Sequence, residues 1–284
     1  PKAPTLIINI FIKRENKGLL VPDCLDWIWV NDIIFNYQLG PIFRHTFAGH
    51  EVPEFISTQW NQKQLITFVK NTRATVLAIK LFKIMDAAAI PSVVIRGLSL
   101  SNHIYPGDGA SLRPMCDVDM LIRPCDRENL KKALESEAFY TTKRLRSQLV
   151  YRVNNITFEI HWSLLTPKRY RLAVDSEAFL ETRQRVDLPE GRIYCLSYEY
   201  ELIGLVVHAF VHHELKGILA LVDIAILIEH YALDWQFIAE WCRKARLSRM
   251  FVFTLSLVDY LFGLNLEKKL LLFEQFSSND AEDF

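Results

Sequence analysis

The segment Arg113-Pro-Met-Cys-Asp-Val-Asp-Met-Leu-Ile122 carries two carboxylates one residue apart, followed at once by an apolar run. We expect Asp117 to Ile122 to form a strand, in which side chains alternate in direction with period two. Asp117 and Asp119 then point to the same face, roughly 7 Å apart, while Val118 and Met120 point to the opposite face. Because two like charges so close repel each other, the pattern favours a divalent cation that neutralises them.

The composition narrows the class of protein. With 284 residues, of which 50% are hydrophobic, the chain can fill one large core or two to three small ones. Lys+Arg and Asp+Glu are equal at 33 each, so the charge does not favour generic nucleic-acid binding. Five cysteines without a CxxC pair favour a reduced compartment. No apolar stretch is long enough to span a bilayer and no signal peptide is evident, so we expect a cytoplasmic protein with no membrane partner.

The pattern along the chain predicts three regions. Residues 1–89 form an N-terminal helical region, residues 90–190 an α+β core, and residues 191–284 a C-terminal helical region. In the first region we expect a helix over 25–39 and a long amphipathic helix. The apolar face of that long helix is predicted from residues at i, i+3 and i+4 spacing, namely Leu65, Phe68, Val69, Thr72, Val76, Ile79 and Phe82.

The middle region alternates strands and helices, which predicts a small mixed sheet flanked by helices, an α+β fold. The expected elements are a strand over 92–96, a short helix over 98–105, a strand over 117–122, a helix over 127–139 with Asp126 as its N-cap, and a hairpin of 149–153 and 156–164. Asn154-Asn155 lies at the centre of the hairpin and favours a tight turn. Helices are expected over 198–215, 219–230, 235–245 and 248–262 in the last region.

The second strand of the hairpin offers further polar side chains. Glu159 and His161 share one face of this strand, while Phe158 and Ile160 share the other. Glu159 can complete a site of three carboxylates with Asp117 and Asp119, which suits a hard divalent ion, Mg²⁺ or alternatively Mn²⁺. Two such ions about 4 Å apart assist in-line phosphoryl or nucleotidyl transfer, with the third carboxylate as ligand or general base.

A candidate phosphate-binding turn follows the first predicted strand. Gly97 lets the backbone approach a phosphate closely, and the Ser99 hydroxyl can add a donor. Arg96 or Arg113 can neutralise a triphosphate. On these residues alone the pattern supports metal-assisted phosphoryl chemistry.

The chain resembles the bacterial family described as uncharacterised nucleotidyltransferases, within the DNA polymerase β-like nucleotidyltransferase superfamily. The residues that carry the resemblance are Val94-Ile-Arg-Gly97, Tyr105, 113–122, Glu159-Ile-His-Trp162, 205–213 and 219–225, within a span of about 27–264. The sequence departs from the family where Arg96 replaces a usual Lys, and from the superfamily where Leu98 separates Gly97 from Ser99. Gly97 is therefore the firmer candidate of the two for phosphate binding.

The resemblance implies a Mg²⁺-dependent enzyme that transfers a nucleoside monophosphate from an NTP, with ATP as first choice, to a small-molecule or peptide acceptor in a biosynthetic pathway. Asp117, Asp119 and Glu159 would be the metal ligands and catalytic residues, and Arg96, Gly97, Ser99 and Arg113 would bind the nucleotide. Two alternatives remain open. One is an idle scaffold that binds a nucleotide or a partner protein, and the other is a kinase-like transfer of the γ-phosphoryl group.

Single residues also have alternative interpretations. Arg96 and Arg113 could be salt-bridge partners of Asp117 or Asp119 in a protein without metal. His161 is better explained as a hydrogen-bond partner of the ligands than as a catalytic base. The group of His208, His212 and His213 has helical spacing suited to zinc, but core histidines or polar groups facing a cleft are the favoured interpretation.

Overall fold

A computed structural model describes residues 26–48, 50–105, 107–135, 140–144, 148–163 and 176–278. The chain divides into two compact units. The first unit comprises residues 1–68, 111–114 and 205–284, and the second comprises residues 69–110 and 115–204. The predicted three-part division of the chain stays a prediction, and the two units are described separately below.

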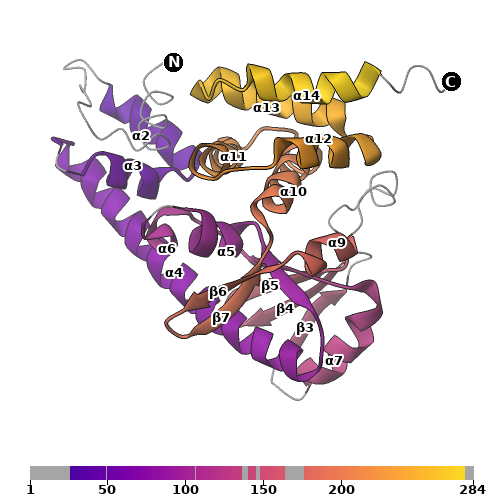
Figure 1. The fold of residues 1–284 in the computed structure, drawn as a ribbon. Coiled ribbons are helices and arrows are strands. Elements are labelled where there is room, and N and C mark those ends of the chain that lie inside the picture. Colours follow the sequence, from indigo (N-terminus) through magenta and orange to yellow (C-terminus); the bar gives the residue numbers. More distant parts are fainter. Residues whose placement is uncertain are drawn as a thin grey trace. The chain divides into compact units, whose positions relative to one another are not determined.

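The second unit is built on a five-stranded mixed sheet with the order β1-β2-β5-β4-β3 (Figure 1). Its strands are β1 (Ser92–Ile95), β2 (Val118–Ile122), β3 (Tyr140–Arg144), β4 (Gln148–Val153) and β5 (Ile156–His161). The neighbours β2 and β5 are parallel, and the other adjacent pairs are antiparallel. A separate hairpin consists of β6 (Gln184–Leu188) and β7 (Gly191–Cys195). The mixed sheet with its helices confirms the predicted α+β class.

One face of the sheet forms the core of this unit. Val118 and Met120 of β2, with Phe158 and Ile160 of β5, are fully buried there. They pack with side chains from the C-terminal half of α4 (Glu54–Ala87) and from α7 (Arg127–Glu135). Because side chains alternate along a strand, Asp119 and Glu159 lie on the opposite face. The apolar residues thus fix which face carries the polar ones.

The β4–β5 hairpin follows the expected turn chemistry. Asn154 and Asn155 have φ of 49° and 63°, so both central residues of the two-residue loop are left-handed. Type I′ turns need this conformation, and Asn tolerates it better than most residues. The predicted hairpin is confirmed, but its second strand ends at His161 instead of Leu164, which itself lies outside the described residues.

Several predicted boundaries shift in the structure. The strand expected from Asp117 begins at Val118, so Asp117 lies in the preceding turn. The short helix after β1 is divided into α5 (Gly97–Ser99) and a π-helical turn over Leu100–Ile104. The helix α7 is described to Glu135, and its predicted end at 136–139 lies outside the described residues. Asp126 belongs to a 3₁₀ turn, where its carboxylate accepts hydrogen bonds from Arg123.

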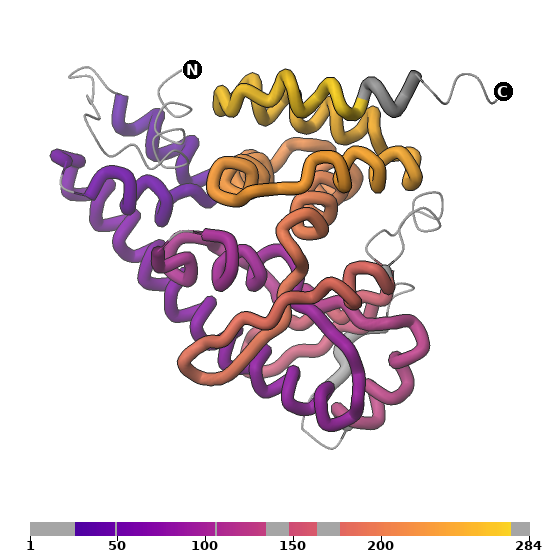
Figure 2. Tube along the Cα trace, in the orientation of Figure 1, coloured from indigo at the N-terminus to yellow at the C-terminus, as the bar shows by residue number. Residues whose placement is uncertain are grey.

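The first unit is helical. It contains α2 (Trp27–Asn36), α3 (Gly40–Thr46), α6 (Gly109–Leu112) in part, α11 (Ile218–His230), α12 (Trp235–Lys244), α13 (Ser248–Phe262) and α14 (Glu267–Ser278), together with the ends of α4 and α10 (Tyr198–Val211). Figure 2 follows the chain through α12, α13 and α14, which lie against one another. The short α9 (Ser176–Glu181) belongs to the second unit. Among the described residues, no helix is both long enough and apolar enough to cross a membrane.

Four of the residues predicted on the apolar face of α4 are exposed, so this part of the prediction is wrong. Leu65, Phe68 and Val76 are 63%, 41% and 45% exposed, and Val69 is exposed as well. The face that packs on the sheet instead carries small and apolar residues, among them Ala74, Ala78, Leu81 and Met85. Of the predicted residues, Ile79 and Phe82 are buried as expected. Periodicity detects an apolar stripe, but small residues let a different stripe approach the sheet more closely.

This difference between two phenylalanines of one helix is testable. We expect Phe82→Ala to lower the free energy of unfolding by about 3–5 kcal/mol, because it leaves a cavity in the core. Phe68→Ala should cost less than about 1 kcal/mol, because its ring already contacts water. Chemical denaturation followed by circular dichroism measures both values. Equal losses for the two variants would show that the exposed stripe is covered in solution.

Candidate active site

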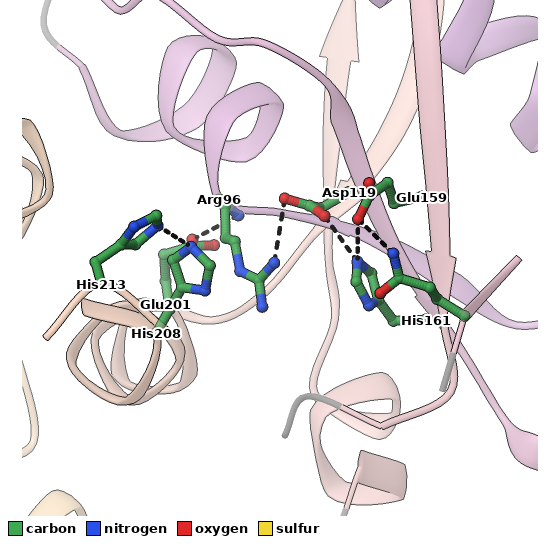
Figure 3. A network of polar contacts seen from close by, with 8 residues as sticks. Arg96, Asp119, Glu159, His161, Glu201, His208 and His213 are labelled. Atoms are coloured by element: carbon green, nitrogen blue, oxygen red, sulfur yellow. Dashed lines mark hydrogen bonds and ion pairs between the residues drawn. The ribbon is translucent and has the colours of Figure 1, made fainter. Parts of the chain in front are cut away.

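The parallel pairing of β2 and β5 brings two of the predicted ligands side by side. The register aligns Asp119 with Glu159 and Leu121 with His161. One ligand atom from each of Asp119, Glu159 and His161 lies within 4.8 Å of the others (Figure 3). The group stands on the sheet face opposite the apolar core, so rigid strands set its geometry.

Hydrogen bonds orient the members of this group. His161 Nε2 lies 2.7 Å from Asp119 Oδ1 and 3.8 Å from Glu159 Oε2. Gln148, on the neighbouring strand β4, donates to Glu159 Oε2 at 2.7 Å. His161 and Asp119 are both buried, and Glu159 is half-buried. This geometry suits the predicted place of His161 as a hydrogen-bond partner of a ligand, and it leaves Glu159 the most accessible of the three.

Arg96 contacts the group from the end of β1. The antiparallel register pairs Ile95 with Asp119, so Arg96, the next residue, lies close to the Asp119 carboxylate. Its guanidinium Nη1 lies 3.3 Å from Asp119 Oδ2. The predicted alternative, a salt bridge between Arg96 and one of the aspartates, is therefore present in the structure. This salt bridge balances the charge of Asp119, while the negative charges of Asp117 and Glu159 remain.

Asp117 lies half-buried in the turn before β2 and feels this remaining charge. Burial raises the pKa of Asp117, and the charges of Asp119 and Glu159 raise it further, while Arg96 opposes them. Lys70 of α4 donates to the carbonyl of Cys116 at 3.1 Å and so fixes the backbone just before Asp117. The predicted repulsion between Asp117 and Asp119 is thus present and includes Glu159 as well.

The turn after β1 is held by a residue that the sequence did not suggest. Glu201, in the first turn of α10, accepts hydrogen bonds from the Arg96 backbone N–H at 3.1 Å and from the Ser99 hydroxyl at 2.7 Å. Ser99 is fully buried, and its hydroxyl, predicted as a phosphate donor, donates instead to Glu201. Gly97 lies between them in the turn and is also buried.

The other predicted site residues belong to the first unit. Arg113 makes a paired interaction with the buried Asp223, with Nε–Oδ1 and Nη2–Oδ2 distances of 3.2 and 2.7 Å. Its role in nucleotide binding stays a prediction. At the end of α10, His213 Nε2 and His208 Nε2 are 2.9 Å apart. The described residues contain a group of three or more metal-binding side chains at Asp119, Glu159 and His161, and the histidines of α10 are not part of it.

The donor set fits a hard divalent cation. Carboxylate oxygens are the ligands that Mg²⁺ and Mn²⁺ prefer, and one imidazole is compatible with Mn²⁺. Burial and then the charges of Asp119 and Glu159 raise the pKa of Asp117 and so penalise its charged form, and Arg96 opposes them only in part. A cation in contact with these side chains would remove that penalty.

Comparison with known proteins identifies the family of the chain. A family model described as "Uncharacterised nucleotidyltransferase" matches residues 23–263. The chain belongs to this family. Membership makes the protein a nucleotidyltransferase and confirms the resemblance drawn from the motifs around Gly97, Asp117 and Glu159. A search of curated proteins finds no match to the chain.

Solved structures similar to the chain include two of ANT(2'')-Ia. A solution structure of this antibiotic-resistance factor shares 13% identity, covers 74% of this chain and 94% of its own, and has a TM-score of 0.40. A crystal structure of ANT(2'')-Ia with adenylyl-2''-tobramycin also shares 13% identity, with coverage of 73% and 98% and a TM-score of 0.39. An antigenic nucleotidyltransferase-like protein from Paracoccidioides brasiliensis shares 17% identity, with coverage of 71% and 92% and a TM-score of 0.47.

The raised pKa of Asp117 predicts a pH-dependent cost to stability. The folded protein binds a proton at Asp117 more tightly than the unfolded chain does, so the contribution of this group falls as pH rises above its ordinary pKa of 3.8. In the presence of a chelator, Asp117→Asn should therefore raise Tm at pH 7–8, by on the order of 2 °C. The gain should shrink as the pH falls toward 4, because Asp117 then becomes protonated.

Differential scanning fluorimetry across this pH range measures the effect. Asp32→Asn, at an exposed position of α2, is the matched control and should leave Tm unchanged at every pH. A destabilised Asp117→Asn variant at neutral pH would contradict the penalty that burial and the neighbouring carboxylates place on the charged form of Asp117.

Proposed function

We propose that the protein is a Mg²⁺-dependent nucleotidyltransferase that transfers a nucleoside monophosphate from an NTP, with ATP preferred, to a small-molecule or peptide acceptor in a biosynthetic pathway. The observation that carries the proposal is the group of Asp119, Glu159 and His161, whose ligand atoms lie within 4.8 Å. This cluster stands next to Arg96 and the Gly97 turn. Membership of a nucleotidyltransferase family supports transfer of a nucleotidyl group over other phosphoryl transfers.

The metal ligands in this proposal are Asp117, Asp119 and Glu159. The carboxylates of Asp119 and Glu159 are adjacent, and the charges of both reach Asp117. His161 holds Asp119 through Nε2, and Gln148 holds Glu159, so both ligands are fixed before any ion arrives. Bound Mg²⁺, as two ions in this chemistry, neutralises the phosphates and favours deprotonation of the attacking oxygen.

The residues of the turn bind the triphosphate. Arg96 presents a guanidinium whose planar shape suits phosphate oxygens, and it stands beside the carboxylates that hold the metal. Gly97 adds a backbone without a side chain, which permits a close approach. The balanced charge, 33 basic against 33 acidic residues, supports a small or peptide acceptor over a nucleic acid.

The proposed reaction forms one bond and breaks one. An acceptor oxygen attacks the α-phosphorus of the NTP, and the bond from this phosphorus to the bridging α–β oxygen breaks. Pyrophosphate leaves with the electron pair of the broken bond. The proton of the acceptor passes to the half-buried Glu159 carboxylate. An acceptor that is already ionised has no proton to transfer.

Metal-dependent nucleotide binding gives the first test. Isothermal titration should show that α,β-methylene-ATP binds the wild-type protein with Mg²⁺ and binds at least about tenfold more weakly after chelation. Asp119→Asn should lose this metal dependence, because it removes a ligand from the centre of the group. Asp187→Asn, at an exposed position of the β6–β7 hairpin, is the control and should bind like wild type.

Product analysis then decides the reaction class. Candidate acceptors incubated with the protein, Mg²⁺ and each NTP should gain the mass of one nucleoside monophosphate, with release of pyrophosphate. Asp119→Asn should slow this reaction by roughly a thousandfold, the loss of several kcal/mol of charge stabilisation. Formation of ADP in place of pyrophosphate would assign a kinase. Nucleotide binding that is indifferent to both metal and Asp119 would overturn the proposed site.

A further inference from the structure

The backbone of Arg96 adopts a conformation that side chains other than glycine rarely occupy. Its φ is 57° and its ψ is −127°. In this region the Cβ atom crowds the neighbouring backbone, so the conformation costs free energy and persists only where the surrounding structure holds it. The residue is an arginine that contacts Asp119, so the strained position lies inside the candidate active site.

The group that holds this backbone is the Glu201 carboxylate. Its Oε1 accepts the Arg96 N–H at 3.1 Å, and its Oε2 accepts the Ser99 hydroxyl at 2.7 Å. One side chain therefore bridges both ends of the four-residue turn that contains Gly97. Glu201 is 1% exposed and lies 105 residues beyond Arg96 in sequence. Local sequence preference alone does not supply this contact.

The main chain and the side chain of Arg96 contact different residues. Figure 3 shows its main chain bonded to Glu201 and its guanidinium directed toward Asp119, 3.3 Å away. Holding the backbone N–H at one point fixes the direction in which the Arg96 side chain leaves the turn. The same hydrogen bonds fix the path of the main chain at Gly97.

We propose that Glu201 is the positioning residue of the nucleotide-binding turn. It keeps Arg96 and Gly97 in the conformation that receives the triphosphate, and it acts through them without touching the nucleotide. This inference rests on the proposed function, which assigns the turn to an NTP. It also gives Ser99 a different task from the one predicted: its hydroxyl ties the turn to Glu201.

The surroundings of Glu201 agree with a structural anchor beneath the turn. Ser99 is fully buried, and its hydroxyl also reaches the thiol of Cys195. Burial raises the pKa of Cys195, with a smaller opposing effect of Ser99, so this thiol stays neutral. The contacts of Glu201 with the turn are thus made in a dry environment, where hydrogen bonds are stronger than in water.

Two variants test whether the length or the charge of the Glu201 side chain holds the turn. Glu201→Asp keeps a carboxylate but shortens the side chain by one methylene, so it cannot bridge Arg96 and Ser99. Glu201→Gln keeps the length. Its amide oxygen can still accept from the Arg96 N–H, and its amide nitrogen can donate to the Ser99 hydroxyl. A positioning role therefore predicts that Asp is the damaging substitution and Gln the tolerated one.

The turn itself gives a readout that needs no nucleotide. Hydrogen–deuterium exchange of a peptide that covers residues 94–100 should show a protected Arg96 amide in the wild type. Exchange should be at least about tenfold faster in Glu201→Asp, because the N–H loses its buried acceptor. Glu201→Gln should retain the protection. An Asp variant with unchanged exchange would overturn the inference whatever the protein does with nucleotides.

Nucleotide affinity gives the second readout. If the turn is correctly placed only part of the time, the apparent Kd rises by the inverse of that fraction. We expect Kd for α,β-methylene-ATP with Mg²⁺ to rise about tenfold in Glu201→Asp and less than about threefold in Glu201→Gln. The opposite order, with Gln weaker than Asp, would show that the charge of Glu201 matters and its reach does not, and would overturn the inference.

Asp126→Asn controls for a general loss of stability. Asp126 is another buried carboxylate of the same unit, bonded to Arg123 away from the turn. This variant should lower Tm without changing Kd or the exchange of residues 94–100. If it weakens nucleotide binding as much as Glu201→Asp does, the effect is structural and the positioning role is refuted. A wild-type protein that binds no nucleotide would refute the proposed function, and amide exchange would still decide whether Glu201 holds the turn.

Discussion

Three carboxylates close to one guanidinium are the constraint on which the rest of the site depends. Asp119 contacts Arg96 and His161, whereas burial and then the charges of Asp119 and Glu159 raise the pKa of Asp117. The carboxylates cannot separate to relieve the repulsion, because the parallel register of β2 and β5 fixes Asp119 beside Glu159. That register is fixed in turn by the apolar residues on the other face, since a slip of one residue would turn the charges into the core. Core packing therefore maintains an electrostatic arrangement that the site would not adopt alone.

The salt bridge of Arg96 and the metal site describe two states of the same residues. Without a cation, the guanidinium partly neutralises Asp119, which lowers the cost of keeping the carboxylates together. In the proposed function, a cation takes over that neutralisation, and Arg96 is then available to the phosphates. An arginine suits this exchange of partners because carboxylate and phosphate oxygens offer its planar donors the same geometry. The alternative interpretation of Arg96 as a structural salt bridge is thus part of the same proposal.

Features that depend on neighbouring residues could be predicted from the sequence, whereas features that depend on distant residues could not. Alternation in Val118-Asp119-Met120 and Phe158-Glu159-Ile160 is local, so it predicted both strands and the faces of their side chains. The turn at Asn154-Asn155 is local as well. The strands β3, β6 and β7 were missed because each has only five residues, so an alternation such as that of Arg185-Val-Asp-Leu188 covers too few positions to stand out. The apolar stripe of α4 was assigned to the core, since periodicity reveals a stripe but not what packs on it. Glu201 could not be found, because an acidic residue in the first turn of a helix already has an ordinary explanation in the helix dipole.

The charges of the site also connect metal and nucleotide. Asp117, Asp119 and Glu159 would repel a triphosphate more strongly than Arg96 attracts it, so the carboxylates alone disfavour an NTP. In the proposed function, two divalent cations would reverse the sign of the local charge, and the phosphates would in turn supply oxygens that help to hold the cations. Metal and nucleotide would then each raise the affinity for the other, and by linkage the two effects would be equal. The strained turn would matter for this coupling, because it holds the Arg96 guanidinium beside Asp119, one of the proposed metal ligands. If Glu201 positions the turn as proposed, its two buried hydrogen bonds determine where the guanidinium would pass from the carboxylate to the phosphates.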